Sequence, residues 1–567
     1  MAKPIQIGGS DFAKIIRKGA LFVDKTLFIK EIINDQSDVT LITRPRRWGK
    51  TLNLSMLHYF LSAEIDGQKT AGLFDQLLIA KEPGDYIAKH QGQYPVIFIS
   101  LKDVKMFTFE QALEKIQSLI QSAYQKHRVL LTQQQQPLAA EDKQLFVKHL
   151  NKQVSEIELT ESLLFLSKLL YEYHKQKVYI LIDEYDTPMN FARTHDYFNH
   201  MALFMKNFLG ASLKDNRYLE KAVMTGILRI SKDSMLSGLN NPQIYTVLKD
   251  DRYAPYFGFT DEELDPLFAD QNLVKNEAEV KAWYNGYCIN GLTLYNPWSI
   301  MCCLDHKADI VPYWLNTGDD SLLKELLQNA TTDIKQQFQE LVLGNAVTVS
   351  VNQTMRFDEV ATDKSMLWNL LVSAGYLTVR SANRAIDQFI CELMIPNQEV
   401  LGLYKSMFLQ WLSKTTDPIE IRSFVSLLGE GKINEFEQHI ERFLKMAASV
   451  HDYAHQPEAF YQGFMLALTV SLMDRYYIFS NHESGLGRPD LIMIPKGSPA
   501  NQAVILEFKT VTGKQKLQKR AQEALKQIQA RDYDSIIGQY PEIKTILQVG
   551  MAFDGKTVRC VQQSKNA

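Results

Sequence analysis

The chain has 567 residues, of which 46% are hydrophobic and 22% charged, and its formal net charge is −3. This length exceeds what one hydrophobic core supports, so we expect three or four domains. The charge excludes a global positive field, so any binding of nucleic acid must use local basic patches. No apolar run reaches ~18 residues, which predicts no membrane partner. Five cysteines, an odd number, without a secretory signal fit a reducing compartment, so we expect a cytoplasmic protein.

The first motif follows a predicted buried strand at residues 39–42 and precedes a helix expected from Leu52 to about Leu61. A strand, a loop ending in Gly-Lys-Thr and a helix form the layout of a P-loop, whose backbone N–H groups cradle phosphates. Lys50 would reach the β- and γ-phosphates of ATP, and Thr51 would bind Mg²⁺. Arg44 stands where the general motif has its first glycine, and the alternative is a basic turn before a helix. The candidate nucleotide-binding residues of the loop are Arg46, Arg47, Trp48, Gly49, Lys50 and Thr51.

An apolar strand at residues 178–182 ends in two acidic residues, Asp183 and Glu184. Asp183 would hold Mg²⁺ through water, and Glu184 would orient the water that attacks ATP. The alternative is a buried parallel strand with an acidic exit, which is common in α/β domains. The motif therefore predicts the second half of an ATPase site.

Two further apolar runs, at residues 96–100 and 222–226, alternate with helical stretches. Four such strands predict an α/β domain with a parallel sheet of the P-loop NTPase type. Thr225 is placed like a polar sensor of the nucleotide. Arg229 either senses the γ-phosphate or forms a surface salt bridge. If Arg229 acted in trans, the protein would need to be a homo-oligomer.

Residues 261 to about 400 are predicted to form a helical and winged-helix-like connector. Thr260 followed by Glu263 is a helix-capping pattern. A helix over residues 367–371, a turn at Gly375 and a strand follow in the order of a winged helix. Such a unit binds DNA or packs on the nucleotide site.

The C-terminal part carries acids and a lysine on two predicted strands. Asp490 begins the first, and Glu507 and Lys509 lie two positions apart on the second, hence on one face. Two carboxylates can hold Mg²⁺ or Mn²⁺, and Lys509 would activate a water and stabilise the charge on phosphorus. Glu458, in the first turn of an upstream helix, is a further candidate ligand. The alternative is a hairpin with a charged edge.

The stretch after Lys509 is strongly basic: residues 509–531 contain seven Lys or Arg and one Glu. Apolar residues recur there at helical spacing, which predicts an amphipathic helix with a basic face. A basic face beside a metal site is expected for nucleic-acid binding, while a solvated helix surface is the alternative. The candidate nucleic-acid contacts are Lys514, Lys516, Lys519, Arg520 and Lys526.

The order of Glu458, Asp490, the Glu507–Lys509 motif and Gln527 resembles the PD-(D/E)xK nuclease superfamily. The N-terminal motifs, with residues 44–51 and 181–186 among them, resemble a bacterial AAA-ATPase-like family in which a nuclease-like domain follows. The resemblance covers almost the whole chain, and the family's loop usually has the form Arg-Pro-Arg-Arg. It implies an AAA-ATPase-like P-loop domain at 1–260, the connector at 261–400 and an α/β nuclease-like domain at 401–567.

Two functions of different classes compete. The first is an ATP-regulated, metal-dependent nuclease that acts on nucleic acid, with DNA as the preferred partner, in defence or DNA processing. The second is a nucleotide-switched signalling or binding module whose nuclease-like domain does not cut. The first is favoured because a pure binder has no need for three converging charges. The expected cofactors are ATP and Mg²⁺ or Mn²⁺.

Overall fold

The computed structural model forms two compact units, each assembled from two stretches of chain. The first unit comprises residues 1–318 and 348–399, and the second comprises residues 319–347 and 400–567. The structure describes the whole chain except residues 1, 133–136, 231–241, 251, 275, 315–331, 353–363, 386–387, 405–417, 448–460, 462–463, 466–467, 470–471, 473–474, 481–488, 498–500, 512–515 and 532–535. The expected boundary near residue 260 lies inside the first unit and stays a prediction about sequence domains.

A five-stranded parallel sheet organises the first unit, in the order β4-β5-β6-β1-β7. The central strands are buried on both faces, as expected of a parallel sheet covered by helices on each side. All four predicted strands are present, and β7 is an additional one. The strands are β1 (Val39–Thr43), β4 (Val96–Ser100), β5 (Val178–Asp183), β6 (Leu219–Gly226) and β7 (Pro242–Tyr245).

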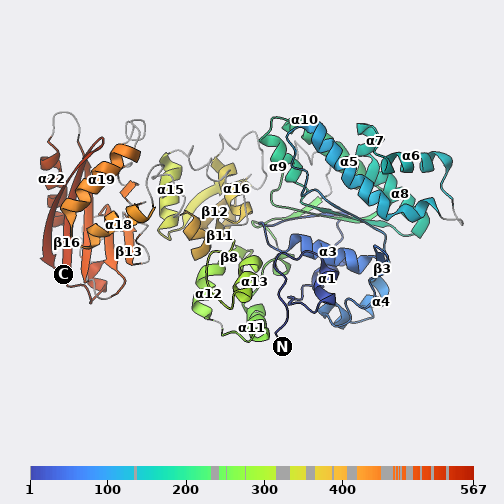
Figure 1. Cartoon of the computed structure of the whole chain (residues 1–567), viewed down its shortest axis with the longest axis horizontal. Helices are drawn as coiled ribbons and strands as arrows, with labels where there is room; N and C mark the ends of the chain where they lie inside the picture. The colour runs from blue at the N-terminus through green and yellow to red at the C-terminus, as the bar shows by residue number, and fades with distance from the viewer. Residues whose placement is uncertain are drawn as a thin grey trace. The chain divides into compact units, whose positions relative to one another are not determined.

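Helices cover both faces of this sheet (Figure 1). One face is covered by α1 (Phe12–Arg17), α2 (Leu27–Asn34), α3 (Lys50–Leu61) and α4 (Tyr86–His90), with the short β2 (Glu64–Ile65) and β3 (Gln68–Lys69) nearby. The other carries α5 (Phe109–Lys126), α6 (Ala140–Leu150), α7 (Glu156–Thr160), α8 (Ser162–His174), α9 (Thr187–Arg193) and α10 (Phe198–Leu213). The main core lies between this second set and the sheet. The predicted α/β parallel-sheet class is therefore confirmed.

The rest of the first unit is helical and winged-helix-like, as predicted. Thr260 and Glu263 form the expected capping box at the start of α11. Helix α16 ends at Ala374 and is followed by Gly375, which has φ 89°. An antiparallel hairpin of β11 and β12 comes next, with β10 beside β12. The elements are α11 (Asp261–Asp270), α12 (Glu277–Tyr284), β8 (Tyr287–Ile289), β9 (Leu292–Leu294), α13 (Pro297–Asp305), β10 (Val347–Val351), α16 (Lys364–Ala374), β11 (Thr378–Arg384) and β12 (Phe389–Met394).

The second unit is built on a mixed sheet in the order β13-β14-β15-β16-β17, in which β15 and β16 are parallel. Helix α22 packs so closely on β16 that a Cβ added at Gly550 would lie 2.3 Å from the Ala521 carbonyl oxygen. The elements are α15 (Thr332–Val342), α18 (Pro418–Gly429), α19 (Ile433–Ala447), β13 (Tyr476–Ser480), β14 (Leu491–Pro495), β15 (Gln502–Thr510), α22 (Leu517–Arg531), β16 (Thr545–Asp554) and β17 (Thr557–Asn566). Of the helices in the described ranges, none has the length and apolarity to span a bilayer.

Candidate nucleotide and metal-binding sites

The P-loop motif lies between β1 and α3, where its backbone makes a tight left-handed turn. Gly49 has φ 77° and caps the N-terminus of α3, so the first N–H groups of the helix point into the loop. The buried Lys50 Nζ donates to the carbonyl oxygens of Arg44 at 3.0 Å and Pro45 at 2.7 Å. Burial lowers the pKa of Lys50, and the charges of Glu184 and Asp183 oppose that shift. The ammonium is thus folded into the loop that would hold phosphates.

Two predicted site residues, Thr51 and Thr225, hydrogen-bond to the buried Asp183 carboxylate at the end of β5. The Thr51 hydroxyl donates to Asp183 Oδ2 at 2.8 Å, and the Thr225 hydroxyl donates to Asp183 Oδ1 at 2.7 Å. Glu184 follows with φ 52°, and its Oε2 accepts from the Thr187 hydroxyl at 3.2 Å. The structure therefore brings together the two predicted Mg²⁺ ligands, the predicted sensor and the predicted water-orienting acid, whose roles remain predictions.

Arg44, the departure from the general motif, is fully buried and ion-paired with Asp250. Its Nη1 also donates to the Thr43 carbonyl at 2.8 Å, and its guanidinium lies 5.1 Å from the centre of the Phe257 ring. The sequence alone did not predict a partner for Arg44. Asp250 lies far along the chain, and no local pattern marks it.

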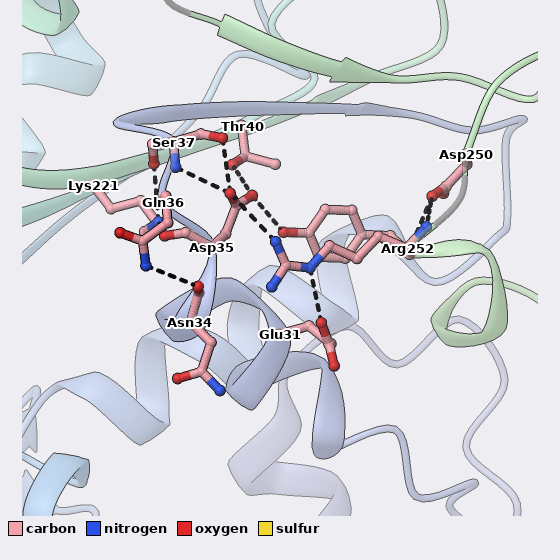
Figure 2. A network of polar contacts seen from close by, with 10 residues as sticks. Glu31, Asn34, Asp35, Gln36, Ser37, Thr40, Lys221, Asp250 and Arg252 are labelled. Atoms are coloured by element: carbon pink, nitrogen blue, oxygen red, sulfur yellow. Dashed lines mark hydrogen bonds and ion pairs between the residues drawn. The ribbon is translucent and has the colours of Figure 1, made fainter.

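Asp250 belongs to a polar network that links it, through Arg252, to Asp35 just before β1 (Figure 2). Its Oδ1 accepts from the backbone N–H groups of Arg252 at 2.9 Å and Tyr253 at 2.6 Å. The side chains of Arg252 and Tyr253 both reach Asp35, at 3.4 Å and 2.8 Å. Burial alone would raise the pKa of Asp35, but hydrogen bonds from Ser37 and Tyr253 hold it below its usual value. Hydrogen bonds and ion pairs therefore connect the P-loop, through Asp250, to the segment that precedes β1.

Aromatic residues of the connector pack against the loop. Trp48 is buried, and its ring meets Tyr287 edge-on at 5.0 Å between centroids. The exposed Arg47, with φ 68°, places its guanidinium 4.0 Å from the centre of the Trp298 ring. Trp48 thus sits in a protein contact, and its predicted role as a nucleotide ligand is untested.

Trp314, Gly375 and Glu399, all in the first unit, complete this cover. Trp314 Nε1 donates to the Arg46 carbonyl at 3.4 Å. A Cβ added at Gly375 would lie 2.9 Å from the Pro45 Cβ. The buried Glu399 accepts from the Trp314 N–H at 2.6 Å, and burial raises the pKa of Glu399 to about 7. Of the two alternatives for the winged-helix-like unit, packing on the nucleotide loop is observed, and DNA binding remains a prediction.

Arg229 follows β6, on a segment that Asp186 and Tyr185 hold in place. Neither of these two residues was predicted to belong to the site. The Asp186 carboxylate accepts from the N–H groups of Ile227 at 3.1 Å and Leu228 at 2.9 Å. The Tyr185 hydroxyl donates to the Leu228 carbonyl at 2.7 Å. Arg229 itself is half-buried, which lowers its pKa, and it lines a cavity with residues of the β11–β12 hairpin. Its predicted role as γ-phosphate sensor is untested.

In the second unit, Asp490, Glu507 and Lys509 meet where β14 begins and β15 ends. Asp490 Oδ2 accepts from the Phe508 N–H at 2.6 Å. Lys509 Nζ lies 3.7 Å from Glu507 Oε1, which also accepts a hydrogen bond from the Gln527 amide on α22. Gln527 is part of the family resemblance, but the sequence did not predict it as a site residue. The available signal was its position next to Ile528, a buried residue of α22.

The electrostatics of Glu507 fit a divalent cation. Its side chain is only 2% exposed, and Oε2 is buried without a hydrogen-bond partner. Burial first, and then the charge of Asp490, raise the pKa of Glu507 to about 8, against the effect of Lys509. An orphaned oxygen beside a second carboxylate is the donor set that Mg²⁺ or Mn²⁺ takes.

A third acidic ligand is not present among the residues that the structure describes. Within those residues no group of three or more His, Cys, Asp or Glu is placed to hold a metal ion. Glu458, the further predicted ligand, and Lys514, a predicted nucleic-acid contact, both lie outside the described residues. A cation would therefore rest on Asp490 and Glu507 within the described part of the site.

The predicted basic helix is α22, which Lys516 directly precedes, and the cations of this segment divide into two kinds. Lys516, Lys519 and Lys526 are exposed. Arg520 is half-buried: its Nε donates to the Thr510 carbonyl at 3.2 Å, and its Nη1 lies 2.7 Å from Glu523. Arg520 therefore stabilises the junction between β15 and α22, whereas the three lysines face solvent.

A family described as "Predicted AAA-ATPase" matches residues 6–236, which hold the P-loop and the Asp183 cluster. The N-terminal region is an AAA-ATPase-like domain. The PD-(D/E)XK nuclease superfamily matches residues 456–563, which hold Asp490, Glu507 and Lys509. The chain thus joins an AAA-ATPase-like domain to a C-terminal PD-(D/E)XK nuclease superfamily domain, as the motifs predicted.

Two proteins are similar to this chain. An uncharacterized protein in the vnfD 5′ region of Azotobacter chroococcum mcd 1 is 26% identical over 495 residues, which cover 86% of this chain and 83% of that protein. Among solved structures, the Walker-type ATPase Paby2304 of Pyrococcus abyssi is similar with a TM-score of 0.33 and 13% identity, covering 67% of this chain and 94% of that one.

Proposed function

We propose that this protein binds and hydrolyses ATP and that the ATP cycle controls a metal-dependent nuclease that cleaves phosphodiester bonds. The observation that carries the proposal is the meeting of Asp490, Glu507 and Lys509, with one Glu507 oxygen buried and unpartnered. Such a set of charges is costly to hold together without a cation. A cytoplasmic role in defence or DNA processing is consistent with this activity and with five free cysteines.

In the ATPase half, each residue has a task that its position allows. Lys50 exchanges its hydrogen bonds to loop carbonyls for bonds to the β- and γ-phosphates. Thr51 and Asp183, now joined by a hydrogen bond, would together hold Mg²⁺, which neutralises phosphate charge when bound. Glu184 orients the attacking water, and Thr225 reports the state of the site through Asp183.

In the nuclease half, Asp490 and Glu507 would hold Mg²⁺ or Mn²⁺. When bound, the cation supplies Lewis-acid activation of the phosphate and lowers the pKa of a water. Lys509, held beside Glu507, orients the water and stabilises the negative charge that develops on phosphorus. Gln527 fixes the orientation of the Glu507 carboxylate by donating to Oε1.

The test is cleavage of plasmid, linear duplex, single-stranded DNA and RNA, with Mg²⁺ or Mn²⁺ and with or without ATP. Glu507→Gln and Lys509→Ala should each reduce cleavage at least about 100-fold. Gln527→Ala should reduce it less, and Gln529→Ala, an exposed glutamine on the same helix, should leave it unchanged. Cleavage that survives Glu507→Gln would show that this site is not the nuclease.

A second candidate is the nucleotide-switched binding module, which the exposed lysines Lys516, Lys519 and Lys526 would serve by contacting nucleic acid. In that case the second unit binds nucleic acid without cutting it. Intact ATP hydrolysis together with no cleavage of any substrate, under any metal, would replace the first proposal by this one. A trans role for Arg229 would add a homo-oligomer to either.

A further inference from the structure

A cavity of about 630 Å³ lies within the first unit and shares no residue with the Asp490–Glu507 site of the second unit. It lies between the β11–β12 hairpin and the residues that follow β6 and β7. Arg229 and Lys249 line it from the ATPase-like core, and Arg380 and Arg384 line it from β11. Of these four cations, only Arg229 is a candidate nucleotide-binding residue.

The charge of this cavity is one-sided. Four cations line it, and no carboxylate is among its described lining residues, although the chain as a whole carries a net charge of −3. A second cavity, of about 600 Å³, provides a comparison because Asp38 and Asp215 line it together with lysines and an arginine. The charged residues that line the first cavity are thus all positive, whereas those of the second cavity have both signs.

The cations are spread over both walls. The half-buried Arg229 is fixed because Asp186 and Tyr185 hold its segment. Lys249 and Arg384 are exposed. Arg380 Nη1 lies 3.6 Å from Glu392, which leaves further donors of its guanidinium for a ligand. Arg380 and Arg384 are four residues apart on β11, roughly 13 Å of strand. This spread exceeds what a single phosphate needs.

The remaining lining adds an aromatic ring. Phe389, half-buried at the start of β12, lines the same cavity. A positive groove with an aromatic platform is how proteins hold single-stranded nucleic acid without regard to its sequence. A cavity of this volume fits a ligand of drug size, which excludes a duplex from its interior.

We propose that this cavity binds a single-stranded nucleic acid, with Arg229, Lys249, Arg380 and Arg384 on its phosphodiester backbone and Phe389 stacked on a base. The inference rests on the proposed function in one respect, because it names the partner on which the nuclease would act. Its own claim is different: the AAA-ATPase-like unit holds the strand at a site other than Asp490–Glu507.

Binding is measured by fluorescence anisotropy with labelled DNA and RNA single strands of about 12 nucleotides. The full chain carries Glu507→Gln and the buffer contains EDTA, so that cutting plays no part. Lys249→Glu/Arg384→Glu should weaken binding at least tenfold. The matched control, Lys126→Glu/Lys143→Glu, makes the same charge change at exposed lysines of α5 and α6 and should change affinity less than about twofold.

Salt dependence gives a second measurement. Lys249→Ala/Arg384→Ala should flatten the plot of log affinity against log salt by about 1.4, or about 0.7 for each lost phosphate contact. Equal affinities and slopes for the cavity variants and their control would overturn the proposal. Unchanged melting temperatures and unchanged ATP binding by the variants would show that the loss is local.

A competition arm separates the two sources of phosphate. In a Lys50→Ala background, ATP and inorganic triphosphate compete with the labelled strand. If triphosphate displaced the strand at concentrations near the dissociation constant of the strand, the proposal would be overturned in favour of a small phosphorylated ligand. If the cavity variants lose binding but the wild type cleaves no substrate, the nuclease proposal fails and the cavity proposal stands. If the wild type cleaves nucleic acid but the cavity variants bind it normally, the cavity proposal fails and the nuclease proposal stands.

Discussion

Arg44 and Asp250 form a fully buried ion pair between residues 206 positions apart in the sequence. Arg44 lies in the phosphate loop, and Asp250 lies in the turn whose other contacts reach Asp35. The Arg44 side chain, through this ion pair, therefore constrains the loop at the position where P-loops generally have a glycine. It also makes the shape of the loop depend on residues far along the chain.

Asp250→Ala should destabilise the first unit by about 3–5 kcal/mol, because it leaves the Arg44 charge buried and uncompensated. Asp270→Ala breaks the exposed ion pair with Lys3 and should cost less than about 1 kcal/mol. Urea unfolding of the full chain, followed by circular dichroism, measures both changes. Similar losses for the two variants would mean that the buried pair contributes no more than a surface pair.

Lys50→Ala should abolish ATP binding, because the alanine cannot reach the phosphates. Lys14→Ala, at an exposed position on α1, should leave it unchanged. Isothermal titration with ATP and Mg²⁺ measures both. Wild-type affinity in Lys50→Ala would remove the P-loop assignment.

The Glu507 carboxyl should make stability depend on pH when metal is removed. Its folded pKa of about 8 lies above the value of about 4.3 in an unfolded chain. Its contribution to stability is therefore complete below the unfolded pKa and is lost as the pH rises through the folded pKa. In EDTA, the free energy of unfolding should fall on the order of 2 kcal/mol between about pH 5 and about pH 9 relative to Glu507→Gln.

Mg²⁺ should reverse this loss, and more strongly at about pH 8 than at about pH 6, because the cation favours the ionised carboxylates. Denaturant curves at each pH, with and without Mg²⁺, provide the measurement. Parallel pH profiles for the wild type and Glu507→Gln would contradict the burial argument.

The exposed lysines of the α22 segment should contribute to nucleic-acid affinity without contributing to stability. Replacing Lys516, Lys519 and Lys526 by alanine should weaken DNA binding and reduce its dependence on salt. Arg520→Ala should instead lower stability by about 1 kcal/mol, since it loses the bonds to Thr510 and Glu523. Filter binding at low salt and thermal melting separate the two effects. Equal DNA affinity in the triple variant would take α22 out of the path of the nucleic acid.

The sheets and the main motifs could be predicted because they are local in sequence. Strands β1 and β5 are continuous apolar runs, and each ends in its functional residues, so composition and motif agree. The same holds for β15, where the spacing of Glu507 and Lys509 places both on one face. A parallel sheet then brings the strand ends, with Thr51, Asp183 and Thr225, to one edge.

Other features could not be predicted because they depend on contacts between distant segments. Strand β7 has four residues and begins with a proline, so only its pairing with β1 makes it a strand. Nothing near Arg44 indicates Asp250. Gln527 is one of several glutamines on α22, and only the packing of this helix on the sheet selects it for Glu507.

The chain passes between its two units three times, at about residues 318, 347 and 399. During synthesis the phosphate loop emerges early, but Gly375 and Glu399, which complete its cover, emerge only after about two-thirds of the chain has been made. Residues 319–347 of the second unit must in turn wait for residues 400–567. The two units therefore cannot fold strictly one after the other on the ribosome, and a fragment cut at residue 318 would leave the loop without part of its natural support.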